Sequence, residues 1–361
     1  MTSATAPAQL RASPPPGAAP LRENNFDALR LIFASMVVVF HVGLLSQAPS
    51  LALATQVSAT FAVQAFFVVS GFLVTMSFEN SSSLITYAKK RLRRILPAYF
   101  LVVVTAALAL CAMSTFAPAD YFGHREFWRY LGFNLVLSNF SAPSLPGVFQ
   151  SNVEAAVNGS LWTIKIEVAF YCVVPLLVWA VRRFGMARAI ATVFVASLLW
   201  KVGFSLAFAS LGSEIYAKLA KQLPGQLSFF VGGAWAYYRT RAGARLPGWA
   251  AALGVVAYFF AAGTLLDVVA PMAVTAIVYW AAVGASSLPR VGKHGDFSYG
   301  VYLYHFPLVQ VFVALGVFQW SPLAACLMLA ALVAGTAVAS WFLVEEPMLH
   351  AHAGTVRLTA R

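Results

Sequence analysis

The amino-acid sequence predicts an all-α polytopic membrane protein with about ten transmembrane helices and with both termini in the cytoplasm. Hydrophobic residues make up 60% of the 361 positions and charged residues only 10%, whereas a soluble domain carries about 25% charged residues. The mean hydropathy is +0.77, and apolar runs long enough to cross a bilayer recur about ten times along the chain. Basic residues, in addition, concentrate in the loops on one side of the predicted membrane.

The expected spans start shortly after a polar N-terminal segment and continue almost to the C-terminus. Between Trp249 and Ser286 the apolar pattern is interrupted mainly by Gly263, Asp267 and Pro271, which we interpret as a tight extracytoplasmic turn. The predicted spans are residues 29–46, 59–78, 95–115, 160–181, 189–211, 224–238, 247–264, 269–287, 298–317 and 322–344.

The distribution of Lys and Arg predicts the orientation. With the N-terminus inside, all but six of the 24 basic residues lie on the cytoplasmic side, in agreement with the positive-inside rule. The net charge of +12 then belongs to short loops that face anionic lipid or an anionic substrate, and nucleic acid is not indicated as a partner. The six exceptions are Arg125, Arg129, Lys165, Lys201, Lys218 and Lys221.

We expect one transmembrane domain, residues 25–348, between two cytoplasmic tails. The first tail, residues 1–24, is rich in Pro, Ala and Ser and is expected to be disordered; it lacks the apolar core of a signal peptide, so the first span would insert the chain. The second tail is residues 349–361. The three cysteines lie in apolar spans without a paired spacing, so the sequence indicates neither a disulfide framework nor a metal site.

His41 is a titratable side chain inside the apolar run from Leu31 to Leu45, and Arg30 stands at the entrance of that run. Their spacing is close to three helical turns, which places both on one helix face, about 16 Å apart along the axis. Ionisable groups at such depth are costly and indicate a functional site by default. The alternative is a structural histidine hydrogen bonded to a neighbouring helix, with Arg30 anchored at the interface.

Two segments next to the cytoplasmic side carry further signals. Ser70 and Gly71 in the second span would allow close helix approach, for which ordinary packing is the simpler interpretation. Arg91 and Arg94 lie at i and i+3, hence on one helix face, where guanidinium groups can bind a phosphate bidentately. The alternative for this basic segment is a positive-inside anchor to anionic lipid.

The fourth span carries a carboxylate at depth. Asn158 or Ser160 can cap the helix, which places Glu167 about two turns inside it. Lys165 points elsewhere, so Glu167 needs a partner on another helix or a proton. We interpret Glu167 as functional.

The C-terminal spans carry the remaining polar groups. His305 lies about two turns into the ninth span, and Pro307 just beyond it can open the local backbone. Glu345 and Glu346 are expected at the solvated cytoplasmic end of the last span.

Taken in this order, the segments resemble the membrane-bound acyltransferase-3 family over about residues 24–348. The resemblance implies O-acylation: an acyl group, most often acetyl, moves from cytoplasmic acyl-CoA to a hydroxyl of a surface or exported polysaccharide or a lipid-linked sugar. It also implies a bacterial inner membrane, no metal, and polysaccharide-assembly proteins as candidate partners. The matching elements are Arg30 with His41, Ser70-Gly71-Phe72, Arg91 with Arg94, Ser160-Leu161-Trp162 to Glu167 and Tyr171, Ser298-Tyr299-Gly300 to His305 and Pro307, and Glu345 with Pro347.

The resemblance supports a role for each of these residues. Arg91 and Arg94 would bind the CoA phosphates, and Arg30 would guide the thiol arm. His41 would act as general base toward the acceptor hydroxyl, because an imidazole titrates near neutral pH, and Glu167 would orient it. Transfer through an acylated imidazole stays open. The expected substrate-binding residues are Ser160, Trp162, Tyr299 and His305.

Two features of the chain bear on how far the family resemblance extends. No hydrolase-like domain follows the last span, so we expect the stand-alone form of the family. The polar segment from Pro143 to Asn158 is a candidate part of the acceptor site.

The alternative function is a proton-coupled secondary transporter or exporter that uses His41 and Glu167 as a proton relay, although no internal repeat supports it.

Overall fold

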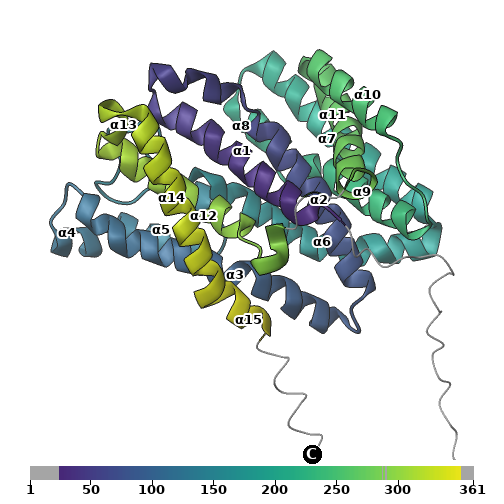
Figure 1. Ribbon diagram of the computed structural model, residues 1–361, viewed down its shortest axis with the longest axis horizontal. Coiled ribbons are helices and arrows are strands. Elements are labelled where there is room, and N and C mark those ends of the chain that lie inside the picture. The colour runs from purple at the N-terminus through teal and green to yellow at the C-terminus, as the bar shows by residue number, and fades with distance from the viewer. Residues whose placement is uncertain (1–23, 287, 289–290, 351–361) are drawn as a thin grey trace, which may run out of the picture.

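The computed structural model describes residues 24–286, 288 and 291–350. These residues form helices joined by turns and loops, with no strand among them, which confirms the predicted all-α class (Figure 1). The tails predicted at residues 1–24 and 349–361 fall almost entirely outside the described residues.

The helices follow one another with short connections, except for a long loop before α6. The α-helices are α1 (Phe26–Ser46), α2 (Ala59–Glu79), α3 (Leu84–Ala109), α4 (Pro118–Gly123), α5 (Arg125–Leu135), α6 (Trp162–Phe184), α7 (Met186–Leu211), α8 (Glu214–Ala220), α9 (Leu223–Arg241), α10 (Gly248–Phe260), α11 (Gly263–Tyr279), α12 (Ser298–Ala314), α13 (Val317–Trp320), α14 (Pro322–Ser340) and α15 (Glu346–His350). The 3-10 turns are η1 (Pro49–Gln56), η2 (Leu110–Met113), η3 (Asn139–Ser141), η4 (Gly159–Leu161) and η6 (Val291–His294), and the π-helical turns are η5 (Trp280–Gly284) and η7 (Trp341–Glu345).

Seven helical segments in the described part of the chain are long and apolar enough to cross a membrane. Helices also occupy the three other predicted ranges, as α9, α10 and α12, so the positions of the helices agree with the sequence pattern. Helices α10 and α12 have 13 and 17 residues, fewer than the roughly 20 that a straight crossing needs. The count of about ten crossings therefore stays a prediction. The seven segments are Phe26–Ser46, Pro49–Glu79, Leu84–Met113, Gly159–Phe184, Met186–Leu211, Gly263–Gly284 and Pro322–Leu349.

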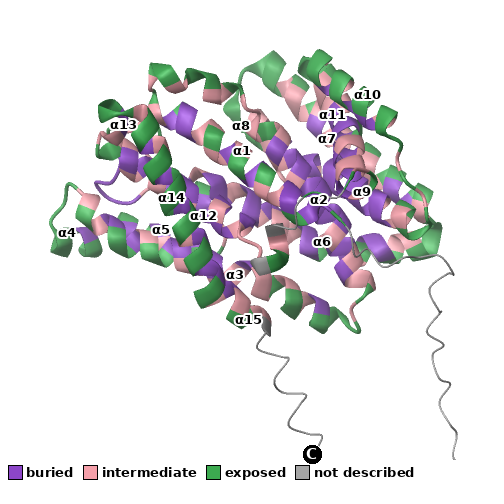
Figure 2. Ribbon diagram, in the orientation of Figure 1, coloured by how far each residue is buried: buried purple, intermediate pink, exposed green. Residues whose placement is uncertain are grey.

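Helix α9 lies in the core of the bundle. It packs against α2, α6, α7 and α11, and most of its middle residues are buried, as the purple ribbon around α2 and α9 shows in Figure 2. A helix that contacts protein on all sides does not need the apolar surface that lipid requires of an exposed helix. This explains why α9 is not among the seven apolar segments although it is 19 residues long.

Helices α2 and α9 approach each other so closely that only glycine fits at their crossing. A Cβ atom on Gly71 would overlap the carbonyl oxygen of Phe230, and a Cβ atom on Gly233 would overlap that of Val68. Small residues at such crossings let the two backbones pack directly against each other. Gly71 thus has the packing role that the sequence pattern allowed.

The turn between α10 and α11 lies earlier than predicted. Helix α10 ends at Phe260, and α11 begins at Gly263, which adopts a positive φ of 53°. Asp267 and Pro271 lie inside α11 and not in the turn. Asp267 is tolerated in the helix because its carboxylate forms an ion pair with the largely buried Lys201 of α7, at 3.3 Å.

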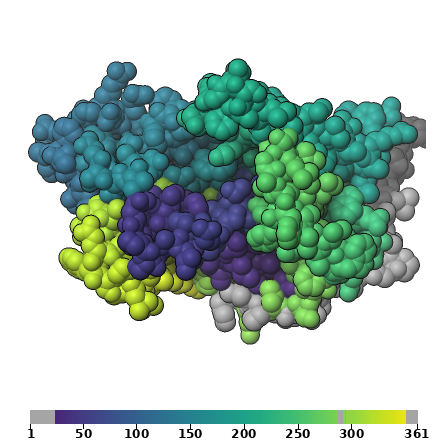
Figure 3. Space-filling model, turned by 90° about the horizontal axis from the view of Figure 1, so that it is seen from above, coloured from purple at the N-terminus to yellow at the C-terminus, as the bar shows by residue number. Residues whose placement is uncertain are grey.

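Helix α1 lies between helices from distant parts of the chain. It packs against α2 on one side and against α12 on the other. Figure 3 shows the N-terminal residues, in purple, between the C-terminal residues in yellow and the green region of α10 and α11. Residues from both ends of the chain therefore meet around α1.

The crossing of α2 and α9 gives a test of the packing. We expect Gly233→Ala to lower the midpoint of thermal unfolding in detergent, because overpacking a close contact costs about 1–3 kcal/mol. The matched control is Gly203→Ala in α7, where an added Cβ meets no atom within 4 Å. A midpoint for Gly233→Ala equal to that of the control would contradict the packing described for this crossing.

Candidate active site

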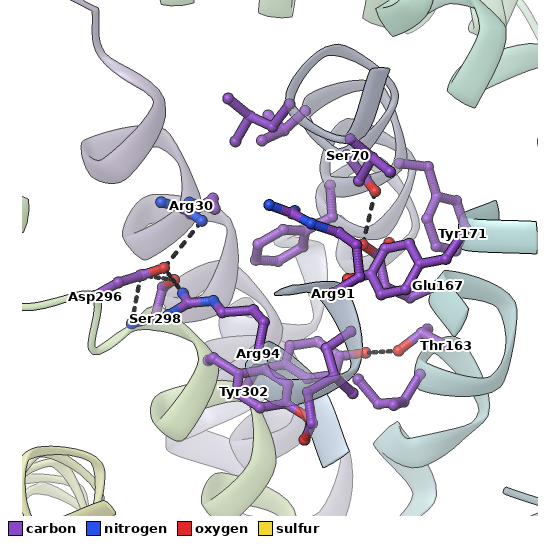
Figure 4. Close-up of a pocket in the computed structure, with 18 of the residues that line it drawn as sticks. Arg30, Ser70, Arg91, Arg94, Thr163, Glu167, Tyr171, Asp296, Ser298 and Tyr302 are labelled. Carbon is purple, nitrogen blue, oxygen red and sulfur yellow. Dashed lines mark hydrogen bonds and ion pairs between the residues drawn. The ribbon is translucent and has the colours of Figure 1, made fainter. Parts of the chain in front are cut away.

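A pocket with charged side chains in its wall opens where α1, α2, α3, α6 and α12 meet (Figure 4). It encloses about 830 Å³ of empty space, part of it open to solvent, and its wall is mostly apolar with three arginines and two acidic residues. The lining residues are Arg30 of α1; Val63, Phe66, Phe67, Val69, Ser70, Leu73 and Val74 of α2; Arg91, Arg94 and Ile95 of α3; Thr163, Ile164, Glu167 and Tyr171 of α6; and Asp296, Ser298, Tyr299 and Tyr302 at the start of α12.

Asp296 organises one end of the pocket. One of its carboxylate oxygens accepts from Arg30, with Nη1 at 2.9 Å, and also pairs with Arg94. Its other oxygen accepts from the backbone N–H and the hydroxyl of Ser298, at 3.3 and 2.5 Å, which fixes the turn just before α12. Asp27 holds Arg30 from the other side. Asp296 is not among the residues predicted from the sequence, and its position just before a helix is the signal that could have indicated it.

Arg91 and Arg94 line the same pocket, as their i, i+3 spacing predicts. Figure 4 shows Arg91 extended into the pocket beside Tyr171, whose ring centre lies 6.0 Å from the guanidinium carbon. The Nε atoms of Arg91 and Arg30 are buried and have no hydrogen-bond partner among the described residues. A buried N–H group without a partner costs about 1–3 kcal/mol, so an anionic ligand that supplies oxygen atoms would be favoured here.

Glu167 lies on the wall opposite the ion pairs of Asp296. It sits in α6 after the 3-10 turn η4, whose start Asn158 caps by accepting from the Ser160 N–H at 3.2 Å. The Ser70 hydroxyl donates to Glu167 Oε1 at 2.7 Å, and Tyr171 also hydrogen bonds to the carboxylate. Ser70 therefore contributes a partner for the deep carboxylate, in addition to the packing role of its segment.

The far end of the pocket is closed by hydroxyl groups. The Thr163 and Tyr302 hydroxyls are 2.8 Å apart, and the Tyr302 hydroxyl donates to the Ser160 carbonyl at 3.2 Å. The Tyr302 ring lies next to His305, with 5.8 Å between ring centres. The pocket therefore ends one side chain away from His305.

His41 and His305 form a pair behind this end of the pocket. His41 Nδ1 is 3.0 Å from His305 Nε2, and the ring centres are 5.1 Å apart. Neither histidine lines the pocket. The side chain of His305 has no exposed surface, whereas His41 is only partly buried.

The predicted pairing of Glu167 with His41 is not what the structure shows. Glu167 is bonded to Ser70, and the ring partner of His41 is His305. The reason is helix geometry: Arg30 reaches the pocket from the first turns of α1, and His41 lies about three turns further along the same helix. Glu167 therefore lies in the pocket with Arg30 and Arg91, whereas His41 lies against His305 of α12.

The four predicted substrate-binding residues do not lie together in the structure. Tyr299 lines the pocket, where its hydroxyl donates to the Ile95 carbonyl at 2.9 Å. Ser160 is buried and donates to Asn158 Oδ1 at 2.7 Å, and Trp162 packs against the core at the start of α6. His305 contacts His41, as described above.

Glu345 is not at a solvated helix end. Only 1% of its surface is exposed, and the Ser340 hydroxyl donates to its Oε1 at 3.0 Å. The π-helical turn η7 explains the difference, because the extra residue in the turn rotates Glu345 out of the direction that a regular helix would give it.

Comparison with known proteins gives this arrangement a family. Residues 23–344 match a protein family described as an acyltransferase domain, the acyltransferase-3 family. The chain belongs to this family. The resemblance based on Arg30, His41 and the Arg91–Arg94 pair is thereby confirmed, and the protein is an acyltransferase with helices suited to span a membrane.

Two related proteins match most of this acyltransferase's length, and a third matches about half of it. An O-acetyl transferase of Shigella phage Sf6 is 31% identical over 301 residues, which is 81% of this chain and 86% of the relative. Nodulation protein 10 of Rhizobium leguminosarum bv. viciae is 28% identical over 364 aligned positions, 90% of this chain and 93% of the relative. The O-acetyltransferase OatA of Staphylococcus aureus is 27% identical over 191 residues, 48% of this chain and 28% of that protein. No solved structure matches the chain.

Pro307 and Asn158 determine the hydrogen bonding of α12 next to His305. Proline has no N–H, so the Leu303 carbonyl four residues earlier loses its helical donor. Asn158 Nδ2 replaces that donor at 2.9 Å, in the buried interior. Pro307 therefore removes one backbone hydrogen bond from α12, and Asn158, in the loop before α6, supplies a side-chain hydrogen bond in its place.

This substitution of donors can be tested by a double-mutant cycle. We expect Asn158→Ala to destabilise the protein by about 1–3 kcal/mol, because it leaves a buried carbonyl unsatisfied. In a Pro307→Ala background the restored backbone N–H bonds to Leu303, so the same substitution should cost less. Thermal unfolding in detergent measures both differences. Equal costs in the two backgrounds would contradict the assigned role of Asn158.

Proposed function

We propose that this protein transfers an acyl group, acetyl in the simplest case, from cytoplasmic acyl-CoA to a hydroxyl of a surface or exported polysaccharide or a lipid-linked sugar. The observation that carries the proposal is the pocket of this acyltransferase-3 family chain, which combines three arginines. The Nε groups of two of them, Arg30 and Arg91, are buried without a partner in the part of the chain that the structure describes. One relative that matches 81% of this chain is named O-acetyl transferase, which supports acetyl as the group transferred.

The arginine end of the pocket is the proposed donor site. The CoA phosphates would be bound by Arg91 and Arg94, with Arg30 completing the cluster, since guanidinium groups bind phosphate oxygens bidentately. Asp296 keeps Arg30 and Arg94 in place by neutralising part of their charge. The positive-inside distribution assigns this end to the cytoplasm, where acyl-CoA is made.

The apolar wall of the pocket is suited to the uncharged arm of the donor. Phe66, Phe67 and Leu73 of α2 line the cavity. An arm that follows this wall would direct the thioester toward Thr163 and Tyr302, beside the histidine pair. In this proposal the reacting carbonyl reaches the histidines from the cytoplasmic side, and the acceptor reaches them from the opposite side.

The proposed reaction is one direct displacement. His41 accepts the proton of the acceptor hydroxyl as its oxygen bonds to the thioester carbon. The carbon–sulfur bond then breaks, the thiolate of CoA leaves, and the proton on His41 returns to that sulfur. The products are an ester on the acceptor and free CoA. Glu167, which accepts from the Ser70 hydroxyl, lines the same pocket as Arg91 and would help to position the donor there.

The proposed location is the bacterial inner membrane, with acyl-CoA on one side and the glycan on the other. The loop from Pro143 to Asn158 is the proposed contact for the acceptor or for a polysaccharide-assembly protein. It packs onto α12 near the histidine pair: Gln310, which is fully buried, donates to the Ala156 carbonyl at 2.8 Å and accepts from Asn152 at 2.9 Å. This attachment keeps the loop next to His305.

The donor site is tested with purified protein and labelled acetyl-CoA. We expect the Arg91→Ala, Arg94→Ala double variant to raise the KM for acetyl-CoA at least tenfold, because two charge-assisted contacts of about 1.5–3 kcal/mol each are lost. The control is Lys90→Ala, which removes one charge from an exposed position of the same helix. If the double variant behaves like the control, the arginine pair is a topology anchor.

The same assay separates the enzyme from the rival transporter. An acyltransferase releases CoA and labels an acceptor, whereas an exporter driven by protons moves solute without consuming acetyl-CoA. Turnover that requires Arg91 and Arg94 supports the enzyme. Proton-coupled solute uptake without CoA release would contradict the proposal.

The general-base role is tested in cells. We expect His41→Ala, at wild-type abundance in the membrane, to reduce acylation of the surface glycan by about 10²- to 10⁴-fold. Mass spectrometry of the glycan measures the loss and reads the acyl mass directly. The matched control is Val39→Ala, at an exposed position of the same helix. Wild-type acylation in the His41→Ala strain would contradict the base role.

A further inference from the structure

We propose that His305 is a positioning residue. It holds His41 in one tautomer, in which the Nε2 lone pair of His41 is directed away from His305 and toward the acceptor hydroxyl. This inference rests on the proposed role of His41 as general base. It replaces the substrate-binding role predicted for His305 with a role that acts through His41.

The backbone around His305 determines which of its nitrogens carries the proton. Nδ1 lies 2.8 Å from the carbonyl oxygen of Tyr302 and 3.2 Å from that of Val301. A carbonyl oxygen only accepts, so Nδ1 is the donor. His305 has no exposed surface, and its ring neighbours are Tyr302, Phe306 and His41. In such surroundings the neutral ring is favoured, and a neutral imidazole with a proton on Nδ1 has an acceptor at Nε2.

That acceptor determines the state of His41. His305 Nε2 lies 3.0 Å from His41 Nδ1, so His41 Nδ1 donates the hydrogen bond. The two ring planes differ by 24°, which brings the N–H close to the plane of the accepting lone pair. A neutral His41 with a proton on Nδ1 has its lone pair on Nε2, on the opposite side of the ring. The pair therefore prepares His41 to accept a proton at Nε2.

Neighbouring rings restrict the rotation of His41. Phe306 and Phe40 meet the imidazole edge-on, with ring centres 5.0 and 5.5 Å away. Rotation of the His41 ring would break the hydrogen bond to His305 and press the ring against these neighbours. The hydrogen bond and the packing thus select the same orientation.

The pair also favours the product of the proton transfer. When His41 Nε2 takes a proton, its Nδ1–H still points at His305 Nε2, and that hydrogen bond becomes charge-assisted and stronger. His305 can perform this role because both of its nitrogens already have protein partners. No polar atom of His305 is left to bind a substrate.

The segment that carries His305 is fixed from outside the helix. The Leu303 carbonyl, freed by Pro307, accepts from Asn158, and the Tyr302 hydroxyl is held by Thr163 and Ser160. The carbonyls that orient His305 therefore belong to a turn of α12 that α6 and its preceding loop hold in place.

The experiment measures the transfer of label from ¹⁴C-acetyl-CoA in membrane vesicles of the producing cells, over a range of acetyl-CoA concentrations. We expect His305→Phe to lower kcat by about 10²- to 10⁴-fold with the KM for acetyl-CoA within about twofold, as loss of the group that selects the tautomer of a catalytic histidine does elsewhere. We expect His305→Gln to recover at least tenfold of that loss, because its amide oxygen can take the place of Nε2 as acceptor. His305→Asn, which is too short to reach His41, should not recover it.

Two results would overturn the inference. One is His305→Phe with wild-type kcat, or with a raised KM alone. The other is a loss from His305→Phe that multiplies the loss from His41→Ala, since residues that act as one unit show no further loss in the double variant. Should His305→Phe fail to accumulate, the comparison of His305→Gln with His305→Asn decides, and equal rates for the two would overturn the inference. Wild-type kcat in His41→Ala instead overturns the proposed base role of His41, on which the inference rests, so the two failures are distinguishable.

Discussion

The carboxylate of Asp296 is the interaction on which the pocket depends. Arg30 on α1 and Arg94 on α3 converge on one of its oxygens, and Ser298 at the start of α12 donates to the other. Without an anion between them, the two guanidinium groups would repel each other and separate the helices that carry them. Three helices from distant parts of the chain therefore meet at one charge, and the cavity beside it stays open to a further anion.

Three other deep polar groups follow the same rule, each with a partner on a different helix. Glu167 has Ser70, Lys201 has Asp267, and His41 has His305. In an apolar environment an unpaired polar group costs several kcal/mol, so pairing between helices also determines which helices are neighbours. The polar residues of this membrane protein consequently contribute to its architecture as well as to its chemistry.

The sequence predicts local features well and distant pairings poorly. Hydropathy locates the helices, and the i, i+3 spacing of Arg91 and Arg94 places both on one wall, because these features depend on neighbouring residues only. The partner of His41 lies 264 residues away, and a single sequence carries no sign of such a contact. Asp296 was missed for the same reason, since its two arginines lie on α1 and α3. The burial of Glu345 was missed because a regular helical period does not include the π turn η7.

Helix α1 runs unbroken from Phe26 to Ser46 and carries both Arg30 and His41. The rise of the helix fixes the separation of Arg30 and His41 at about 16 Å along the axis. The helix therefore determines the distance between the proposed phosphate site and the proposed base. Adding or removing one residue between them would rotate His41 by about 100° and move it about 1.5 Å. The stretch between Arg30 and His41 can therefore exchange one apolar residue for another, but its length is not free to vary.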